Sequence, residues 1–199
     1  MASNLWELLV TAGLGWVLSI YPASQPSGAL ERQLPVTGPV DYGSSHHDYP
    51  ATDIFARCGA PVVAPVAGVV LEVGRVDRWR PTTDLGGARG GRFVSVRGRD
   101  GVRYYSSHLS RVRAGVRPGT TVRAGRRLGS VGRSGSARDT PCHVHFGISP
   151  VCAGTGQWWI RRGTVSPYRF LNSWRSGGRL SPARAVSDWK DEHGCPRRP

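Results

Sequence analysis

The 199-residue sequence is poor in lysine, methionine and acidic residues. Lys190 is the only lysine, so the 27 basic residues are nearly all arginine; 13 acidic residues leave a formal net charge of +14. No apolar run comfortably reaches the roughly 20 residues that span a bilayer. With 39% hydrophobic residues, the chain is too apolar for a disordered basic tail and too interrupted for a membrane bundle. Its length excludes a large multidomain assembly.

Two zinc-associated motifs are missing. The cysteines do not form a C-x-x-C pair, which argues against a structural zinc site built on thiolates. No H-E-x-x-H helix is present, so the glutamate base of that class of metalloprotease is excluded. The four cysteines are an even number, which fits an oxidising compartment, although four buried free thiols fit equally well. They stand at Cys58, Cys142, Cys152 and Cys195.

The N-terminal region contains one short apolar stretch, Leu8–Ile20, followed by small and turn-forming residues at 23–29. Its length is typical of an export signal, and we expect a secreted or cell-envelope protein. Glu7 precedes the stretch and no basic residue does, so an uncleaved anchor and a misplaced start both stay open.

The arginine content has two interpretations. A genomic bias toward arginine codons would produce it without any functional demand. Alternatively, the surface attracts polyanions such as nucleic acid, an anionic membrane or an anionic cell-wall polymer. Net charge alone does not choose among these partners.

Glycine and proline, with 27 and 15 residues, occur at short intervals along the chain and indicate frequent turns. The β-branched runs between them predict a β-rich fold. The pair Asp100-Gly101 predicts a hairpin turn between strands at 93–96 and 102–106. A glycine-rich insertion at 75–91 is expected to wall a groove. Further strands are expected within 61–73, 121–124, 128–131 and 143–148, and a short helix at 168–174. We expect a leader at 1–34, one domain at 35–176, and a loosely ordered polar tail at 177–199 unless Cys195 ties it down.

Histidines in three segments of the sequence are the main indication of function. His143 and His145 are two residues apart in a strand-like run, so both rings point to one face. His46 and His47 precede Asp53 in a second segment, and His108 ends the second hairpin strand. A catalytic zinc ion takes three protein ligands of these types and keeps one position for water. The three contexts together predict a metal site with spare groups for proton transfer.

Three ordered stretches between His46 and Pro150 resemble the lysostaphin-type (LytM-like) zinc endopeptidases, which cut peptides of bacterial peptidoglycan. CGAPVVAPVAGVV (58–70) resembles the family's first hairpin, and GGRFVSVRGRDGVRYYSSHLS (90–110) its central hairpin. VRPGTTVRAGRRLGSVGRSGSARDTPCHVHFGI (116–148) resembles the glycine-punctuated stretch that closes on H-x-H-F. The resemblance implies a mainly β fold: a single domain built on an antiparallel sheet, with a groove and only short helices.

The resemblance also implies roles for individual residues. His145 and Asp53 correspond to zinc ligands, and His108 and His143 to catalytic histidines. The third ligand departs from the family pattern H-x-x-x-D, because Tyr49 stands four residues before Asp53. We favour His47 as that ligand, since this needs the smaller loop expansion, and His46 is the alternative.

The implied function is zinc-dependent hydrolysis of peptide bonds in peptidoglycan cross-links or stems. The main alternative is a catalytically inactive LytM-like module that binds the wall or regulates another enzyme. A biotinyl or lipoyl carrier is disfavoured because Lys190 lies in the tail rather than at a hairpin tip. We expect a monomer that binds peptidoglycan and anionic cell-wall polymers but no specific nucleic acid, although Trp158, Trp159, Arg161 and Arg162 could stack on bases.

The cysteine positions suggest two disulfides. Cys142 and Cys152 bracket the H-x-H strand, and we expect them to pair across the loop that follows it. Cys58 and Cys195 then remain as a second pair, which ties the tail to the domain.

Overall fold

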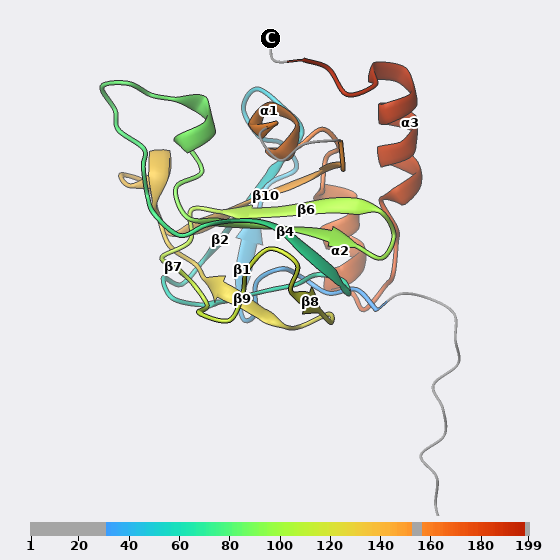
Figure 1. The fold of residues 1–199 in the computed structure, drawn as a ribbon. Helices are drawn as coiled ribbons and strands as arrows, with labels where there is room; N and C mark the ends of the chain where they lie inside the picture. Colours follow the sequence, from blue (N-terminus) through green and yellow to red (C-terminus); the bar gives the residue numbers. More distant parts are fainter. Residues whose placement is uncertain (1–30, 153–156, 198–199) are drawn as a thin grey trace, which may run out of the picture.

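The computed structural model describes residues 31–152 and 157–197 (Figure 1). The apolar stretch Leu8–Ile20 lies outside these ranges. Within them, no helix has both the length and the apolar character needed to cross a membrane.

A seven-stranded antiparallel sheet forms the body of the molecule, and a smaller three-stranded antiparallel sheet packs against it (Figure 1). This confirms the expected mainly β fold with short helices. The large sheet has the order β1 (Val40–Tyr42), β2 (Thr52–Ala56), β10 (His143–Pro150), β6 (Val102–Ser107), β5 (Phe93–Gly98), β4 (Gly68–Gly74) and β8 (Thr121–Val122). The small sheet has the order β3 (Pro61–Val63), β9 (Arg127–Ser130) and β7 (Arg111–Val112).

In the described part of the chain, three helices follow the strands in sequence, and two 3-10 turns interrupt the loops. The helices are α1 (Trp158–Arg161), α2 (Tyr168–Arg175) and α3 (Ala183–His193), and the turns are η1 (Gly86–Ala88) and η2 (Gly135–Ala137). Helix α2 covers the position where the sequence predicts a short helix.

The central strand β10 separates the core from the functional face. Its alternate residues Val144, Phe146 and Ile148 belong to the hydrophobic core, while the residues between them point to the opposite face because strand side chains alternate. Phe146 is fully buried and packs near Tyr104 and Trp174 of α2, with ring centroids 6.3 and 6.4 Å away. Removing a buried aromatic ring of this kind costs about 3–5 kcal/mol.

The hairpin between β5 and β6 has the turn that the sequence predicts. Gly101 has a φ of +78°, which glycine adopts without steric cost. Asp100 accepts a hydrogen bond from the backbone N–H of Val102 at 3.3 Å. Its other carboxylate oxygen accepts one from the Tyr104 hydroxyl at 2.6 Å. The turn therefore fixes the register that carries Tyr105 and His108 to their places.

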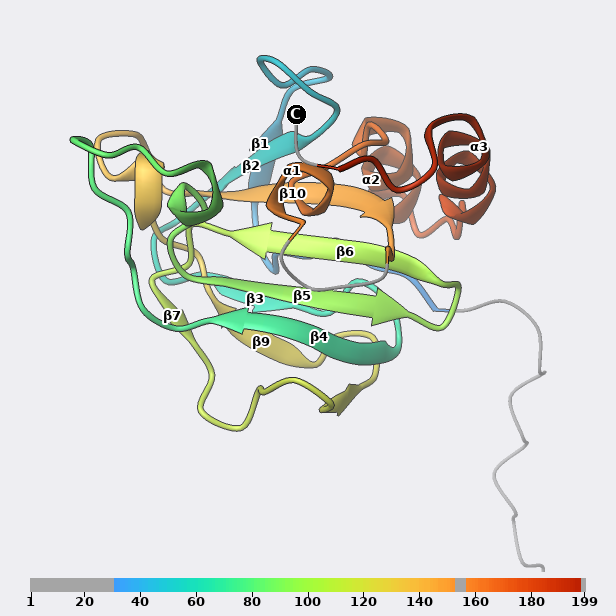
Figure 2. The same cartoon turned by 45° about the horizontal axis from the view of Figure 1, so that its top comes forward.

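The insertion at 75–91 lies on the face opposite the core, where η1 contacts α1 (Figure 2). Gly86 allows this contact, because a Cβ there would lie 2.3 Å from the indole of Trp158. The insertion and α1 therefore meet across one side of the sheet, and the insertion walls a groove as expected.

The structure corrects the expected disulfide pairing. Cys58 bonds to Cys142, with Cα atoms 5.3 Å apart, and Cys152 bonds to Cys195, with Cα atoms 5.8 Å apart. Cys142 and Cys152 cannot pair because the eight-residue strand β10 lies between them. An extended strand rises about 3.3 Å per residue, so its ends are roughly 25 Å apart, far beyond the reach of a disulfide.

The segment expected to be a loosely ordered tail contains α3, the longest helix of the described residues. Val186 of α3 is buried and belongs to the hydrophobic core. Cys195 then joins the chain to Cys152, directly after β10. Both contacts hold this segment against the domain. The sequence predicts a loose tail only if Cys195 does not tie it down, and Cys195 does.

Candidate active site

A pocket of about 270 Å³ opens on the functional face of β10 and β6. It contains the histidines of all three sequence contexts, together with Asp53. The insertion contributes Gly86, Gly87, Arg89 and Gly90 to its wall, and the segment of α1 contributes Trp158, Arg161 and Arg162. The predicted site residues thus come together from three separate parts of the chain.

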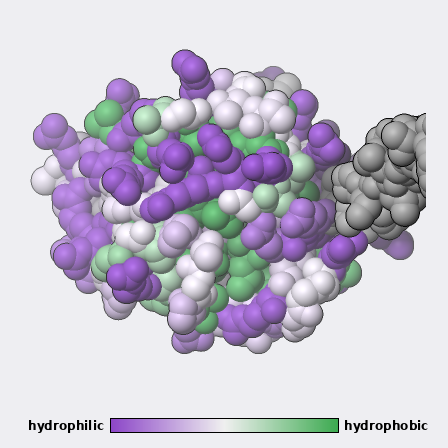
Figure 3. All heavy atoms as spheres, turned by 90° about the horizontal axis from the view of Figure 1, so that it is seen from below, coloured by the Kyte–Doolittle hydropathy of each residue, from purple (hydrophilic) through white to green (hydrophobic). Residues whose placement is uncertain are grey.

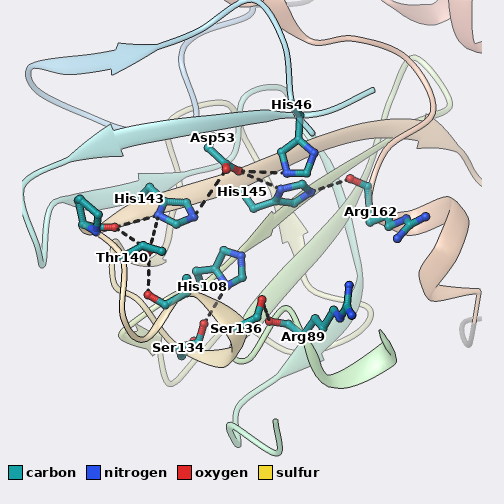
Figure 4. Close-up of polar contacts among 12 residues, drawn as sticks. His46, Asp53, Arg89, His108, Ser134, Ser136, Thr140, His143, His145 and Arg162 are labelled. Carbon is teal, nitrogen blue, oxygen red and sulfur yellow. Dashed lines mark hydrogen bonds and ion pairs between the residues drawn. The ribbon is translucent and has the colours of Figure 1, made fainter. Parts of the chain in front are cut away.

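Asp53 and His145 form the centre of the site. They face each other directly across the pairing of β2 with β10, and Nδ1 of His145 lies 3.0 Å from Oδ1 of Asp53 (Figure 4). Nε2 of His145 lies 2.8 Å from the backbone carbonyl of Arg162. A carbonyl only accepts hydrogen bonds, so Nε2 carries the hydrogen, and a neutral ring presents its Nδ1 lone pair to the carboxylate. Such an arrangement calls for a cation, either a proton or a metal ion, between the two groups.

Gly147 makes the contact between His145 and Arg162 possible. It lies two residues after His145 on the same face of β10. A Cβ at this position would lie 2.3 Å from the Arg162 carbonyl oxygen. Only glycine leaves room for that oxygen to reach the imidazole.

His46, rather than the favoured His47, joins this centre. The donor atoms of His46, Asp53 and His145 all lie within 4.8 Å of one another, and Nε2 of His46 is 3.8 Å from Oδ1 of Asp53. His46 is half-buried and its ring packs against those of Tyr49 and His145, with centroids 4.5 and 4.8 Å away. His47 is the next residue in the loop and is exposed at the pocket edge. The aromatic contacts therefore hold His46 beside Asp53, whereas His47 stays exposed.

The donor set fits a metal ion. Two ligand bonds of about 2.1 Å at a tetrahedral angle separate their donor atoms by roughly 3.4 Å. The measured separations of 3.0 and 3.8 Å from Asp53 lie on either side of this value. The Nε2–H of His145, held by a backbone carbonyl, is the outer hydrogen bond that metal-bound histidines usually make. The cluster therefore suggests a metal held by His46, Asp53 and His145.

His108 and His143 lie beside this cluster with the opposite orientation. Nδ1 of His108 lies 2.8 Å from the Ser134 carbonyl, and Nδ1 of His143 lies 2.9 Å from the Pro141 carbonyl. By the same argument Nδ1 carries the hydrogen in both rings, so Nε2 is left as an acceptor. Nε2 of His143 is 4.0 Å from Oδ2 of Asp53 (Figure 4). The ring centroids of His108 and His143 are 5.0 Å apart.

The backbone of His108 is strained in order to place its ring. Its φ is +63°, a conformation uncommon outside glycine, and it costs on the order of 1 kcal/mol or more. The backbone N–H of His108 donates to Gly90, and its carbonyl accepts from Ser134. The surrounding loops thus hold a conformation that His108 alone would avoid.

The electrostatics keep these groups in forms suited to metal binding and proton transfer. Burial, followed by the neighbouring His145, lowers the pKa of His46 to about 4. Burial and the adjacent His145 and His143 lower the pKa of His108 to about 3. Burial raises the pKa of Asp53, but the close contact with His145 and the nearby His143 and His46 outweigh it and leave the pKa at about 2. At neutral pH His46 and His108 are therefore neutral and Asp53 is a carboxylate.

Sequence reasoning missed several parts of the pocket. Tyr49, Tyr105 and Arg89 line it, and the Arg162 carbonyl orients His145. A backbone carbonyl has no signature in the sequence, but the glycine two residues after the H-x-H pair is an indirect signal. Trp158 packs on the glycines of η1 and Trp159 donates to the Pro196 carbonyl at 3.1 Å, so the pair serves internal contacts in this structure.

The comparisons with known proteins agree with this geometry. The model of peptidase family M23 matches residues 47–156, and the chain belongs to this family. The L-Ala–D-Glu endopeptidase of Bacillus subtilis strain 168 is 31% identical over 130 residues, which are 62% of this chain and 34% of that protein. The chain thus spans about a third of the length of this relative.

Solved structures show the same fold. The catalytic domain of the antimicrobial peptidase lysostaphin from Staphylococcus simulans superposes with a TM-score of 0.50 at 25% identity, covering 67% of this chain and 93% of that one. A structure of lysostaphin itself gives a TM-score of 0.54 at 23% identity, covering 78% of this chain and 59% of that one. The fold is therefore of the lysostaphin/LytM type.

We expect Gly147→Ala to weaken metal binding about 10- to 100-fold, because it displaces the carbonyl that holds His145. Equilibrium dialysis against a chelator measures this. Gly115→Ala is the matched control, since its Cβ enters open space. Equal metal affinity in both variants would show that the Arg162 carbonyl does not orient His145.

Proposed function

We propose that this protein is a zinc-dependent endopeptidase that hydrolyses peptide bonds in bacterial peptidoglycan. The observation that carries the proposal is the juxtaposition of three metal-type donors with two histidines whose Nε2 atoms are free, in the groove of a family M23 fold. The relatives named above, an L-Ala–D-Glu endopeptidase and an antimicrobial peptidase, support an endopeptidase reaction on the wall.

Zinc is the metal that this donor set favours. Two imidazoles and one carboxylate are a ligand set of catalytic zinc sites, which keep a further position for water. When bound, zinc lowers the pKa of that water to about 7 and polarises the scissile carbonyl. His46, Asp53 and His145 would hold the ion.

His108 and His143 are the groups available for proton transfer. Each ring is anchored at Nδ1 by a backbone carbonyl, so its Nε2 accepts a proton from the attacking water without reorienting. The resulting imidazolium is a donor, which stabilises negative charge on the substrate and then returns the proton to the leaving amine. The low pKa of His108 keeps its Nε2 available as an acceptor down to acidic pH.

The alternative is a LytM-like module without catalysis. Such a module does not need two histidines that present Nε2 as an acceptor beside a complete set of metal donors. The strained φ of His108 would also have no function in it. The geometry therefore favours the enzyme.

We further propose that the protein works outside the cytoplasm. All four cysteines are paired in two disulfides, which persist in oxidising compartments. Peptidoglycan lies in such a compartment.

The second binding partner that we propose is an anionic polymer of the wall. Between Asp100 and Asp139 the sequence has nine arginines and no acidic residue. Most of these arginines are exposed on β7, β8, β9 and the loops between them. Figure 3 looks onto this side of the molecule, and hydrophilic side chains extend over much of it. Such a face attracts phosphate- or carboxylate-bearing polymers and leaves the groove open.

The two candidate histidine ligands differ in one measurable property. We expect His46→Ala to lose its zinc, because one of three ligands is removed. His47→Ala should keep about one zinc per chain, as measured by elemental analysis after gel filtration. If His47→Ala lost its zinc and His46→Ala kept it, His47 would be the ligand instead.

The central experiment compares the intact protein with His108→Ala. We expect zinc content to be unchanged and the release of soluble muropeptides from purified sacculi to fall at least about 100-fold, because a proton-transfer group is removed and no ligand is. Zinc binding without hydrolysis by the intact protein on several wall types would favour the non-catalytic module.

The wall-polymer interaction has its own test. We expect Arg111→Gln/Arg113→Gln to reduce binding to sacculi severalfold at low salt and to make binding less dependent on salt, because two charge contacts are removed. Arg169→Gln/Arg179→Gln, which removes the same charge from α2 and the following loop, is the control. Equal losses in both variants would show that only net charge matters, and stronger binding to DNA than to sacculi at moderate salt would contradict the wall partner.

A further inference from the structure

The guanidinium of Arg162 lies in the groove, and its buried Nε has no hydrogen-bond partner among the described residues. Its Nε is inaccessible to solvent, and no hydrogen-bond acceptor among the described residues contacts it. A buried donor left unpaired costs about 1–3 kcal/mol, more for a charged group. This position is therefore unfavourable unless the group has a partner in the working state.

Two aromatic rings hold this guanidinium in place. Its Cζ lies 3.9 Å from the ring centroid of Tyr49 and 5.3 Å from that of Trp158. Trp158 is itself packed against Gly86 of the insertion. Stacking on aromatic faces restrains the plane of an arginine and leaves the N–H groups at its edge available for an acceptor.

The other two arginines of the pocket already have carboxylate partners. Arg161 forms an ion pair with the buried Glu72, and Arg89 forms one with Asp84. Arg162 has no ion pair with any described residue. It is therefore the pocket arginine whose charge is available to a ligand.

Arg162 also lies next to the reaction centre. Its own carbonyl contacts Nε2 of His145 at 2.8 Å, while its side chain extends away from His145 on the side of the site that also holds Arg89 (Figure 4). Extended peptides advance about 3.3–3.6 Å per residue. The Tyr49 ring on which this side chain stacks lies 5.7 Å from the ring of His145. A group bound by the side chain therefore belongs to a substrate residue within about three positions of the scissile bond.

We propose that Arg162 binds a free carboxylate of the substrate peptide close to the bond that is cut. Arginine is suited to this role because its planar fork binds both oxygens of a carboxylate. The inference rests on the proposed endopeptidase function and narrows its substrate to acidic stem peptides. A D-Glu residue in a peptide chain retains one free carboxylate, whereas a glycine bridge has none along its length.

The test compares two synthetic peptides that differ only in this group. One contains L-Ala–D-Glu with its free carboxylate, and the other has that carboxylate converted to a carboxamide. Binding is measured by calorimetry on the full chain carrying His108→Ala, so that turnover is slowed at least about 100-fold. We expect the acidic peptide to bind at least tenfold more tightly than the amide.

Variants at position 162 then test whether Arg162 causes the preference for the acidic peptide over the amide. In the His108→Ala background, Arg162→Gln should abolish the preference by weakening the acidic peptide alone, and Arg162→Lys should restore only part of it. Arg169→Gln, which removes an arginine stacked on Phe170 outside the pocket, should keep the full preference. Zinc content should stay at its original level in all variants, because His145 is held by the backbone of residue 162 and not by its side chain.

The outcomes separate this inference from the proposed function. Equal binding of the two peptides, or equal weakening of both by Arg162→Gln, overturns the role of Arg162. Cleavage of peptides and sacculi by the protein with His108 intact is measured in parallel. If the intact protein prefers the acidic peptide but cleaves neither, the carboxylate site stands and the endopeptidase proposal fails.

Discussion

The pairing of β2 with β10 is the constraint on which the site depends. It sets Asp53 opposite His145, and every other group in the pocket is positioned relative to these two. The Cys58–Cys142 disulfide reinforces the same strand pair at one end, and the core residues Ile54, Val144 and Phe146 anchor its other face. A register shift of one residue would turn the side chains of Asp53 and His145 into the core. Packing of the apolar face and correct placement of the polar face are therefore a single requirement.

The site uses backbone carbonyls to assign a function to each histidine. His145 is held at Nε2 and presents Nδ1, whereas His108 and His143 are held at Nδ1 and present Nε2. Chemically identical side chains thereby present different nitrogen atoms to the pocket, and this division matches the proposed roles of one ligand and two proton acceptors. Burial supports this division at His108, because it lowers the pKa of that ring to about 3 and so keeps its Nε2 lone pair available at neutral pH.

Much of the fold and most of the site follow from the sequence. The strand runs, the Asp100-Gly101 turn and the period-two spacing of His143 and His145 are local signals, and the structure confirms them. The choice between His46 and His47 depended on ring contacts with Tyr49 and His145 that join distant segments. The disulfide pairing likewise depended on which strands are neighbours, and proximity of Cys142 and Cys152 in sequence was misleading because an extended strand separates them. The sequence could not predict that Arg162 lacks a carboxylate partner, because this depends on the ion pairs that Glu72 and Asp84 form with Arg161 and Arg89.

Residue 162 contributes to the site through two independent parts. Its carbonyl, which every amino acid possesses, contacts the ring of His145, and its side chain faces the groove. Under the proposal for Arg162, substitution at this position therefore alters which peptides are accepted while the contact that holds His145 persists. Substrate choice can then diversify by single mutations that leave the cluster of histidines and Asp53 in place.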